Sequence, residues 1–396
     1  MIKSAYRYFS MFLKVLVDRD IRKLVLRKPN SIEIKDVSSA IALSNWLIGA
    51  QKIDSDGGYR TYYLDTKWTS SYPETSGYII PVLLEASKKL HSVEYEKSAL
   101  IAAEWLLSIQ KKEGGWQGGY IHQNRPAIVF NTGQIIRGML AAFEFTENVR
   151  YLESAIRAGN WLTSIQNKKG YWENYVYLNR IRVYDTYVAA PLALLYKATG
   201  NEDYKRAAIA QCEWVINEKQ QKNGWFSDAD NTIKHNDRPI LHTLAYTIDG
   251  LIETGILLER EDFIKAALIP SKILAGKWEL EKCFHGRYNS NWIGSEALIT
   301  TGSAQIAISF LRLNDFYKDP YWRDMAREIL DFLKSIQIID STIKEVRGGI
   351  FGSFPVWGQY EAFGLPNWAN KYFLEGLLMV MPSSGPIIQQ SKSTPS

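Results

Sequence analysis

The stretch EWLLSIQKKEGGW, residues 104–116, decides the fold because versions of it recur along the chain. Each version joins the end of a helix, usually marked by Trp and an apolar residue, to a turn that contains glycine. The helix ends lie 53 to 64 residues apart, at Trp46, Trp105, Trp161, Trp214, Trp278 and Phe332. The turns follow in register at Gly57, Gly114, Gly170, Gly224, Gly286 and Gly348. Six turns at a nearly constant period predict six structural repeats.

Two kinds of helix alternate within these repeats. The segment 93–110 is amphipathic, whereas 77–86, 133–143 and 186–196 are apolar nearly all round, as buried helices are. An outer ring of amphipathic helices around an inner ring of buried ones satisfies both patterns. Because a single hairpin would leave its apolar face in water, we expect the ring to close. The sequence therefore predicts an all-α (α/α)6 toroid.

We expect one toroidal domain over residues 36–382, between a basic amphipathic segment at 1–35 and a disordered tail at 383–396. Residues 1–30 carry a net charge of +6, and the rest of the chain carries −1. This distribution argues against a nucleic-acid surface. Apolar residues at helical spacing in the first segment predict a helix outside the toroid core. Such a helix packs on the ring or makes a peripheral contact with an anionic membrane through residues 1–30.

The composition excludes several classes of protein. Two cysteines, Cys212 and Cys283, are too few for a disulfide framework and lack the spacing of metal ligands. His235 and His242 lie seven residues apart with no third ligand nearby, so we expect neither a metal nor another cofactor. There is no recognisable signal peptide and no window long enough to span a membrane, which predicts a cytoplasmic protein.

Polar residues open the inner helices at positions that follow the repeat. They are Glu74, Asn131, Asp185, His242, Thr301 and Asn367. Helix capping explains the threonine and the asparagines, but Glu and His are not favoured caps. We therefore expect these six side chains to surround one aromatic-lined cavity that is the functional site.

Two stretches bear a resemblance to a known group of enzymes. They are Tyr184-Asp185-Thr186-Tyr187 and residues 190–204, which together with the six hairpins resemble the (α/α)6 six-hairpin glycosidases. Within that group the sequence is most similar to the unsaturated glucuronyl and rhamnogalacturonyl hydrolases. The resemblance implies that Asp185 is the general acid/base. It also implies a second carboxylate where this chain has Asn131, which is a departure from the pattern.

Glycoside hydrolysis of a uronate-containing oligo- or polysaccharide is the function that these residues favour. Inverting hydrolysis needs a protonated acid and an ionised base about 6.5–9.5 Å apart. Glu74 and Asp185 are the predicted pair. We expect the helix dipole to keep Asp185 ionised and desolvation to keep Glu74 protonated.

A second set of residues supports a different chemistry. His242 and Tyr246 share one face of an inner helix, and with Asn131 and Arg287 they resemble the sets of toroidal polysaccharide lyases and uronate C5-epimerases. In that interpretation His242 or Tyr246 abstracts the C5 proton.

The candidate substrate-binding residues combine an expected carboxylate ligand, Arg287, with aromatic and amide side chains that suit sugars. The full set is Asn131, Arg287, Tyr288, Trp116, Trp172, Trp225, Gln305, Tyr360, Glu361, Asn367 and Trp368.

Two further alternatives stay open at this stage. The element Gln110 to Trp116 also resembles the QW repeats of terpene cyclases, although the chain lacks their Asp-x-Asp-Asp motif. A non-catalytic glycan-binding toroid would show an aromatic groove without paired titratable groups.

Overall fold

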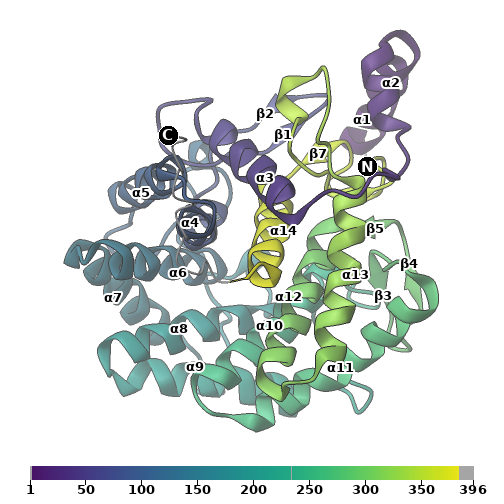
Figure 1. Ribbon diagram of the computed structural model, residues 1–396. Helices are drawn as coiled ribbons and strands as arrows, with labels where there is room; N and C mark the ends of the chain where they lie inside the picture. The colour runs from purple at the N-terminus through teal and green to yellow at the C-terminus, as the bar shows by residue number, and fades with distance from the viewer. Residues whose placement is uncertain (1, 233, 383–396) are drawn as a thin grey trace, which may run out of the picture.

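The helices of the protein form two concentric rings (Figure 1). The structure is a computed structural model that describes residues 2–232 and 234–382, with side chains from residue 7 onward. The predicted (α/α)6 toroid is confirmed. The tail predicted at 383–396 lies outside the described residues.

Outer and inner helices alternate along the chain, as the two sequence patterns indicate. The outer helices are α3 (Asp36–Gln51), α5 (Val93–Ser108), α7 (Val149–Ser164), α9 (Glu202–Trp214), α11 (Glu261–Glu281) and α13 (Pro320–Ile336). The inner helices are α4 (Pro73–Lys89), α6 (Val129–Thr146), α8 (Thr186–Thr199), α10 (Leu241–Leu257), α12 (Thr300–Tyr317) and α14 (Asn367–Val380).

The loops at one end of the rings contain short helices and strands. The short helices are η1 (Ile121–Gln123), η2 (Tyr177–Asn179), η3 (Val183–Asp185), η4 (Val215–Lys219) and η5 (Lys344–Val346). The antiparallel strand pairs are β1 (Tyr62–Tyr63) with β2 (Lys67–Trp68), β1 with β7 (Gly364–Leu365), β3 (Arg287–Tyr288) with β4 (Gly294–Ser295), and β5 (Leu298–Ile299) with β6 (Ser353–Phe354). The pairing of β1 with β7 joins the first repeat to the last.

A glutamine at the end of the outer helix ties neighbouring repeats together. Gln110 Nε2 donates to Gly114 O in its own turn (2.8 Å) and to Ser154 O in the next outer helix (2.9 Å). Gln51 and Gln166 make the same pair of bonds in their repeats. Gln337 closes the ring, because it donates to Gly348 O (2.8 Å) and to Ser39 O of α3 (3.2 Å).

The tryptophans of the turns are structural, which corrects their assignment as sugar-binding residues. Trp116 and Trp172 are 0% and 1% exposed. Their indole N–H groups donate to carbonyls of their own outer helices, at 2.8 Å and 2.9 Å. Trp225 is also buried and donates to Tyr288 O. Each ring fills the core between a turn and its helix, so it presents no face to a ligand.

Glycines let adjacent inner helices touch through their backbones. A Cβ added to Gly138 of α6 would lie 2.3 Å from Gly77 O of α4, and one added to Gly250 of α10 would lie 2.7 Å from the carbonyl carbon of Thr186 in α8. Distances this short leave no room for a side chain. Adjacent inner helices therefore pack closely where the middle of one meets the first turns of the next.

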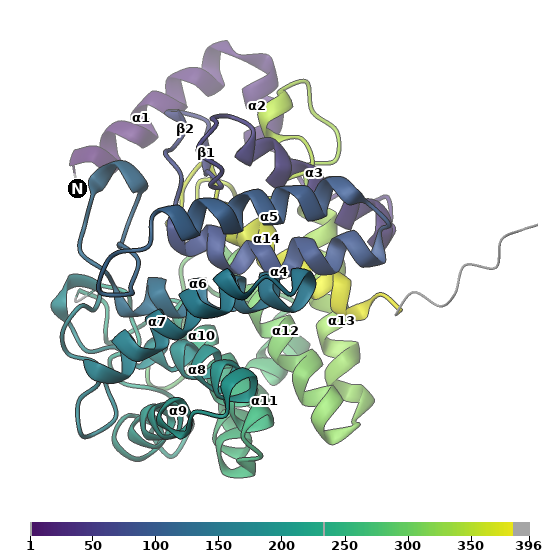
Figure 2. The same ribbon diagram turned by 90° about the vertical axis from the view of Figure 1, so that its left-hand side faces the viewer.

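The N-terminal segment lies outside the rings (Figure 2). It forms two helices, α1 (Ile2–Val17) and α2 (Arg19–Val25), where the sequence predicted one. The break occurs because the Asp18 side chain caps α2 by accepting from Asp20 N and Ile21 N. No helix in the described part of the chain is long and apolar enough to cross a membrane.

Replacing Gln337 by Ala should lower the free energy of unfolding by about 2 to 4 kcal/mol, because two buried carbonyls lose their donor. Urea denaturation measures this change. The control is Gln221→Ala, an exposed glutamine whose loss should cost less than about 0.5 kcal/mol. Equal effects of the two substitutions would contradict the bridging role.

Candidate active site

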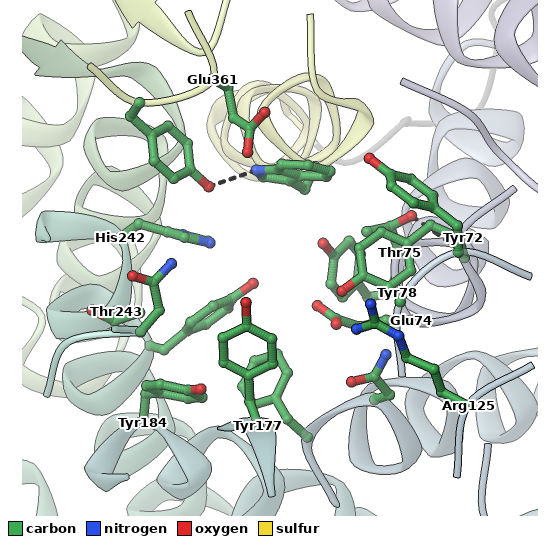
Figure 3. A pocket seen from close by; sticks show the side chains of 18 of the residues that line it. Tyr72, Glu74, Thr75, Tyr78, Arg125, Tyr177, Tyr184, His242, Thr243 and Glu361 are labelled. Carbon is green, nitrogen blue, oxygen red and sulfur yellow. Dashed lines mark hydrogen bonds between the residues drawn. The ribbon is translucent and has the colours of Figure 1, made fainter. Parts of the chain in front are cut away.

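A cavity of about 360 Å³ opens at the N-terminal ends of the inner helices (Figure 3). Residues from the first turns of α4, α6, α10 and α14 line it, together with the loops that precede them. Its wall is rich in aromatic residues, namely Tyr72, Tyr78, Tyr120, Phe130, Tyr177, Tyr184, Tyr246, Tyr360 and Trp368. This composition suits a ligand with flat apolar faces and many hydroxyl groups.

The six polar residues predicted at the cavity all lie at the starts of inner helices, but only three of them line it. Glu74, Asn131 and His242 do so. Asp185, Thr301 and Asn367 are 3%, 0% and 0% exposed and lie outside the lining. Asp185 directly follows Tyr184, which is a lining residue. The prediction that all six surround the cavity is therefore wrong for half of them, because their side chains are buried away from it.

Glu74 is surrounded by tyrosines near the start of α4. It is 8% exposed, and Tyr72 and Tyr78 lie beside it in the cavity wall. Burial raises the pKa of Glu74 to about 7, while a hydrogen bond with Tyr72 acts in the opposite direction. The carboxyl therefore exchanges its proton near neutral pH, as acid–base catalysis requires.

Asp185 is the N-cap residue of α8, yet its side chain makes no capping hydrogen bond. Burial raises the pKa of this carboxyl to about 8, and the positive charge of Arg182 only partly offsets the rise. The prediction that the helix dipole keeps Asp185 ionised is wrong, because desolvation is the larger effect. Burial therefore favours the protonated form of both carboxyls, Asp185 as well as Glu74.

His242 is a neutral residue of the cavity wall. Its Nδ1 donates to Gln305 Oε1 at 2.7 Å, with Nδ1 assigned as donor because the amide oxygen can only accept. Burial lowers the pKa of His242 to about 4, and the Gln305 bond opposes that shift. The ring of Tyr246 lies 4.5 Å from the imidazole, and burial keeps its pKa well above 10. Gln305 thus orients His242 from outside the cavity and does not line it.

The last repeat contributes a polar edge to the cavity. Trp368 Nε1 donates to the hydroxyl of Tyr360 at 2.8 Å, and Tyr63 donates to the carboxylate of Glu361. Burial raises the pKa of Glu361, against the bond from Tyr63. Glu361 has a φ of 49°, a left-handed conformation that is uncommon for Glu. The structure thus places the predicted residues Tyr360, Glu361 and Trp368 at the cavity.

Arg287 is not positioned to bind a ligand in this cavity, which corrects its predicted role. Its guanidinium pairs with Asp230 at 2.8 Å and with Glu296 at 3.1 Å, and it is absent from the lining. Tyr288, on the same strand, is fully buried. These two carboxylates already neutralise the guanidinium of Arg287, which the sequence predicted to bind the carboxylate of a sugar.

Arg125 is the cation that sequence reasoning missed. It is the only Lys or Arg among the lining residues of the described chain, and it is exposed. The side chains of Arg125 and His242 point into the cavity from opposite sides (Figure 3). Arg125 belongs to the irregular loop after the second turn, where no periodic pattern identifies the residues that face inward. Its only sequence signal is its place between that turn and an inner helix.

The sequence is similar to a known protein family over a segment that contains several residues of this site. Residues 108–251 match the model of Glycosyl Hydrolase Family 88. The matched segment contains Asn131, Asp185, His242 and Tyr246, and it covers roughly a third of the chain. No curated protein matches the sequence. The family match supports a glycoside hydrolase, and it does not favour the lyase, epimerase, terpenoid or non-catalytic alternatives.

Solved structures share the fold over nearly the whole toroid. An unsaturated glucuronyl hydrolase specific for heparin has 16% identity and a TM-score of 0.68, over 87% of this chain and 96% of that chain. An unsaturated glucuronyl hydrolase from Bacillus sp. GL1, responsible for the degradation of glycosaminoglycan, has 15% identity and a TM-score of 0.69, over 86% and 96%. A novel alpha-amylase from Clostridium perfringens has 14% identity and a TM-score of 0.65, over 88% and 100%. At these identities the likeness shows the fold.

The two raised carboxyl pKa values predict how stability depends on pH. In the unfolded chain both groups ionise near pH 4, whereas in the folded protein Glu74 and Asp185 keep their protons up to about pH 7 and 8. The folded state thus binds more protons, so the free energy of unfolding falls as pH rises through this window. Relative to the unchanged protein, the Tm of Asp185→Asn and of Glu74→Gln should rise by at least about 2 °C between about pH 5 and pH 9.

Differential scanning fluorimetry across that range measures the difference. Asp324→Asn removes an exposed carboxylate of α13 and is the control, with a Tm difference that should stay constant. If the Tm difference between each site variant and the unchanged protein did not change with pH, the pKa values of Glu74 and Asp185 would not be raised.

Proposed function

We propose that the protein is a glycoside hydrolase that cleaves a uronate-containing glycan in the cavity at the N-terminal ends of its inner helices. The observation that carries this proposal is the pair of buried carboxyls, Glu74 and Asp185, whose pKa values lie close to neutrality. Structural carboxylates are normally ionised and paired, whereas a protonated carboxyl at neutral pH is suited to donate a proton.

The environments of the two carboxyls suggest their roles. Hydrolysis of a glycosidic bond needs a proton for the leaving oxygen and a base for the attacking water. Asp185 stays protonated at neutral pH and is assigned as the acid, which agrees with the role that the family resemblance implies. Glu74 is partly ionised and lines the cavity, so it is assigned as the base. The proposal requires Asp185, which follows the lining residue Tyr184 in the chain, to reach the glycosidic oxygen when the sugar is bound.

Arg125 and the aromatic wall are suited to bind an acidic sugar. A guanidinium can pair with a carboxylate through two parallel hydrogen bonds. Arg125 is the only lining Lys or Arg of the described chain, and no ion pair occupies it among the described residues. Two of the similar structures are unsaturated glucuronyl hydrolases, which agrees with a uronate at this position. Asn131 Nδ2 donates to Gln117 O at 3.3 Å, so its amide oxygen is left to accept from a sugar hydroxyl.

Elimination or epimerisation would need a base that can take the C5 proton. His242, with a pKa lowered to about 4, is a weak base, and Tyr246 is held in its protonated form. We therefore assign both residues to substrate positioning.

Asp185→Asn and Glu74→Gln should each lower kcat by at least about 100-fold, the low end of the contribution of general acid–base catalysis. The assay is mass spectrometry of products from a panel of acidic oligosaccharides, including one with a terminal unsaturated uronate. Hydrolysis adds the mass of one water per bond cleaved. His242→Ala should raise KM more than it lowers kcat.

Circular dichroism of each variant checks that it is folded. The opposite pattern, with His242 and Tyr246 indispensable and both carboxyls replaceable, would overturn hydrolysis in favour of lyase or epimerase chemistry.

Arg125→Met should weaken binding of a uronate-containing oligosaccharide about tenfold, equal to about 1.4 kcal/mol, and leave binding of its neutral analogue unchanged. Isothermal titration calorimetry with the Asp185→Asn background measures both. Arg287→Met is an unsuitable control because it breaks two ion pairs, so Lys272→Met, at an exposed position of the outer helix α11, is used. Equal loss of affinity for the acidic and the neutral sugar would remove the reason for assigning Arg125 to the carboxylate.

A further inference from the structure

Helix α1 has an uncovered apolar stripe along its outer face. Phe9, Phe12, Leu13 and Leu16 are 62%, 60%, 47% and 53% exposed. Their spacing places them on one side of the helix. Exposed apolar side chains that occur singly need no explanation, but a continuous stripe of large residues marks a surface that another body covers.

The opposite face of α1 fixes the helix to the toroid. Met11 is fully buried, Tyr8 OH donates to Trp357 O at 3.0 Å, and Lys14 Nζ donates to Leu64 O at 3.0 Å. Arg7 Nε pairs with Asp65 at 2.8 Å. Figure 2 shows α1 lying beside β1 and β2 at the outside of the molecule. Because these contacts already anchor the helix, the outer stripe is not needed to fold it onto the ring.

Positive charge is concentrated in the same segment. Residues 1–30 carry a net charge of +6, whereas the rest of the chain is close to neutral. Arg19, Lys23 and Lys28 are exposed. A second copy of this chain, packed stripe to stripe, would bring two such segments together and be opposed by their repulsion. An anionic lipid surface complements both the stripe and the charge.

The anchored face of α1 reaches the cavity. The guanidinium of Arg7 lies 4.5 Å from the centre of the Tyr63 ring, and Tyr63 donates to Glu361 in the cavity wall. Tyr8 contacts the loop that carries Tyr360 and Glu361. Helix α1 therefore lies next to the loop that forms this edge of the cavity.

We propose that α1 docks the protein on an anionic lipid surface, with Phe9, Phe12, Leu13 and Leu16 inserted among the lipid headgroups. The exposed basic residues Arg19, Lys23 and Lys28 then face lipid phosphates or carboxylates. Docking in this way holds the cavity close to glycans at that surface, a consequence that rests on the proposed hydrolase function. The docking itself does not depend on it.

The test is cosedimentation of the full chain with vesicles. Binding to equimolar phosphatidylcholine and phosphatidylserine is expected, with much weaker binding to phosphatidylcholine alone and a decrease as salt is raised. The variant Phe12→Glu/Leu16→Glu should lower the bound fraction at least about tenfold. Its control, Ile269→Glu/Leu280→Glu, adds the same charge at exposed apolar positions of α11 and should bind as the unchanged protein does.

Two further measurements separate the possible outcomes. Both variants should cleave a soluble acidic oligosaccharide at the unchanged rate, so a failure of the hydrolase assignment leaves the binding result intact. Equal binding of the stripe and control variants to the mixed vesicles would overturn the proposal. So would a dimer, detected by light scattering, that Phe12→Glu/Leu16→Glu converts to a monomer, because a second copy would then cover the stripe.

Discussion

The architecture depends on a repeated hydrogen-bonding group, the amide of a glutamine at the end of an outer helix. In each of four repeats this N–H group bridges a carbonyl of its own turn and a carbonyl of the next outer helix, at Gln51, Gln110, Gln166 and Gln337. The bridge from Gln337 to Ser39 connects residues almost 300 positions apart and closes the ring. Closure buries the inner helices, and burial produces the unusual chemistry of their first turns.

Closure of the ring also has an unfavourable effect, which is the burial of ionisable groups in the candidate site. Glu74 and Asp185 lie in a ring where inner helices touch through their backbones, so water cannot solvate a carboxylate well. The same desolvation that raises their pKa values makes the folded protein less stable as pH rises. A fold selected for stability alone would place apolar residues at these positions. The proposed hydrolase function accounts for the two carboxyls by a proton transfer that requires them.

The periodic features could be predicted from the sequence, and the non-periodic ones could not. Helix order, ring closure and the positions of Glu74, Asn131 and His242 follow from the repeat, because helix periodicity and turn chemistry are local. Whether an arginine of a loop is free to bind a ligand depends on whether an acidic side chain of the protein lies next to it. Arg287 is paired with Asp230, and the sequence alone does not reveal such a contact between loops. The protonation state of Asp185 depends on its burial in the folded protein, which outweighs the local helix dipole. Trp116 shows the same limit, because its ring suits a sugar but fills the core.

The most direct test of the central claim is a crystal structure of Asp185→Asn with an uncleaved acidic oligosaccharide. We predict a glycosidic oxygen within hydrogen-bonding distance of residue 185, a water or anomeric carbon beside Glu74, and a sugar carboxylate paired with Arg125. A sugar bound elsewhere on the molecule, or one in this cavity with its scissile bond distant from both carboxyl positions, would contradict it.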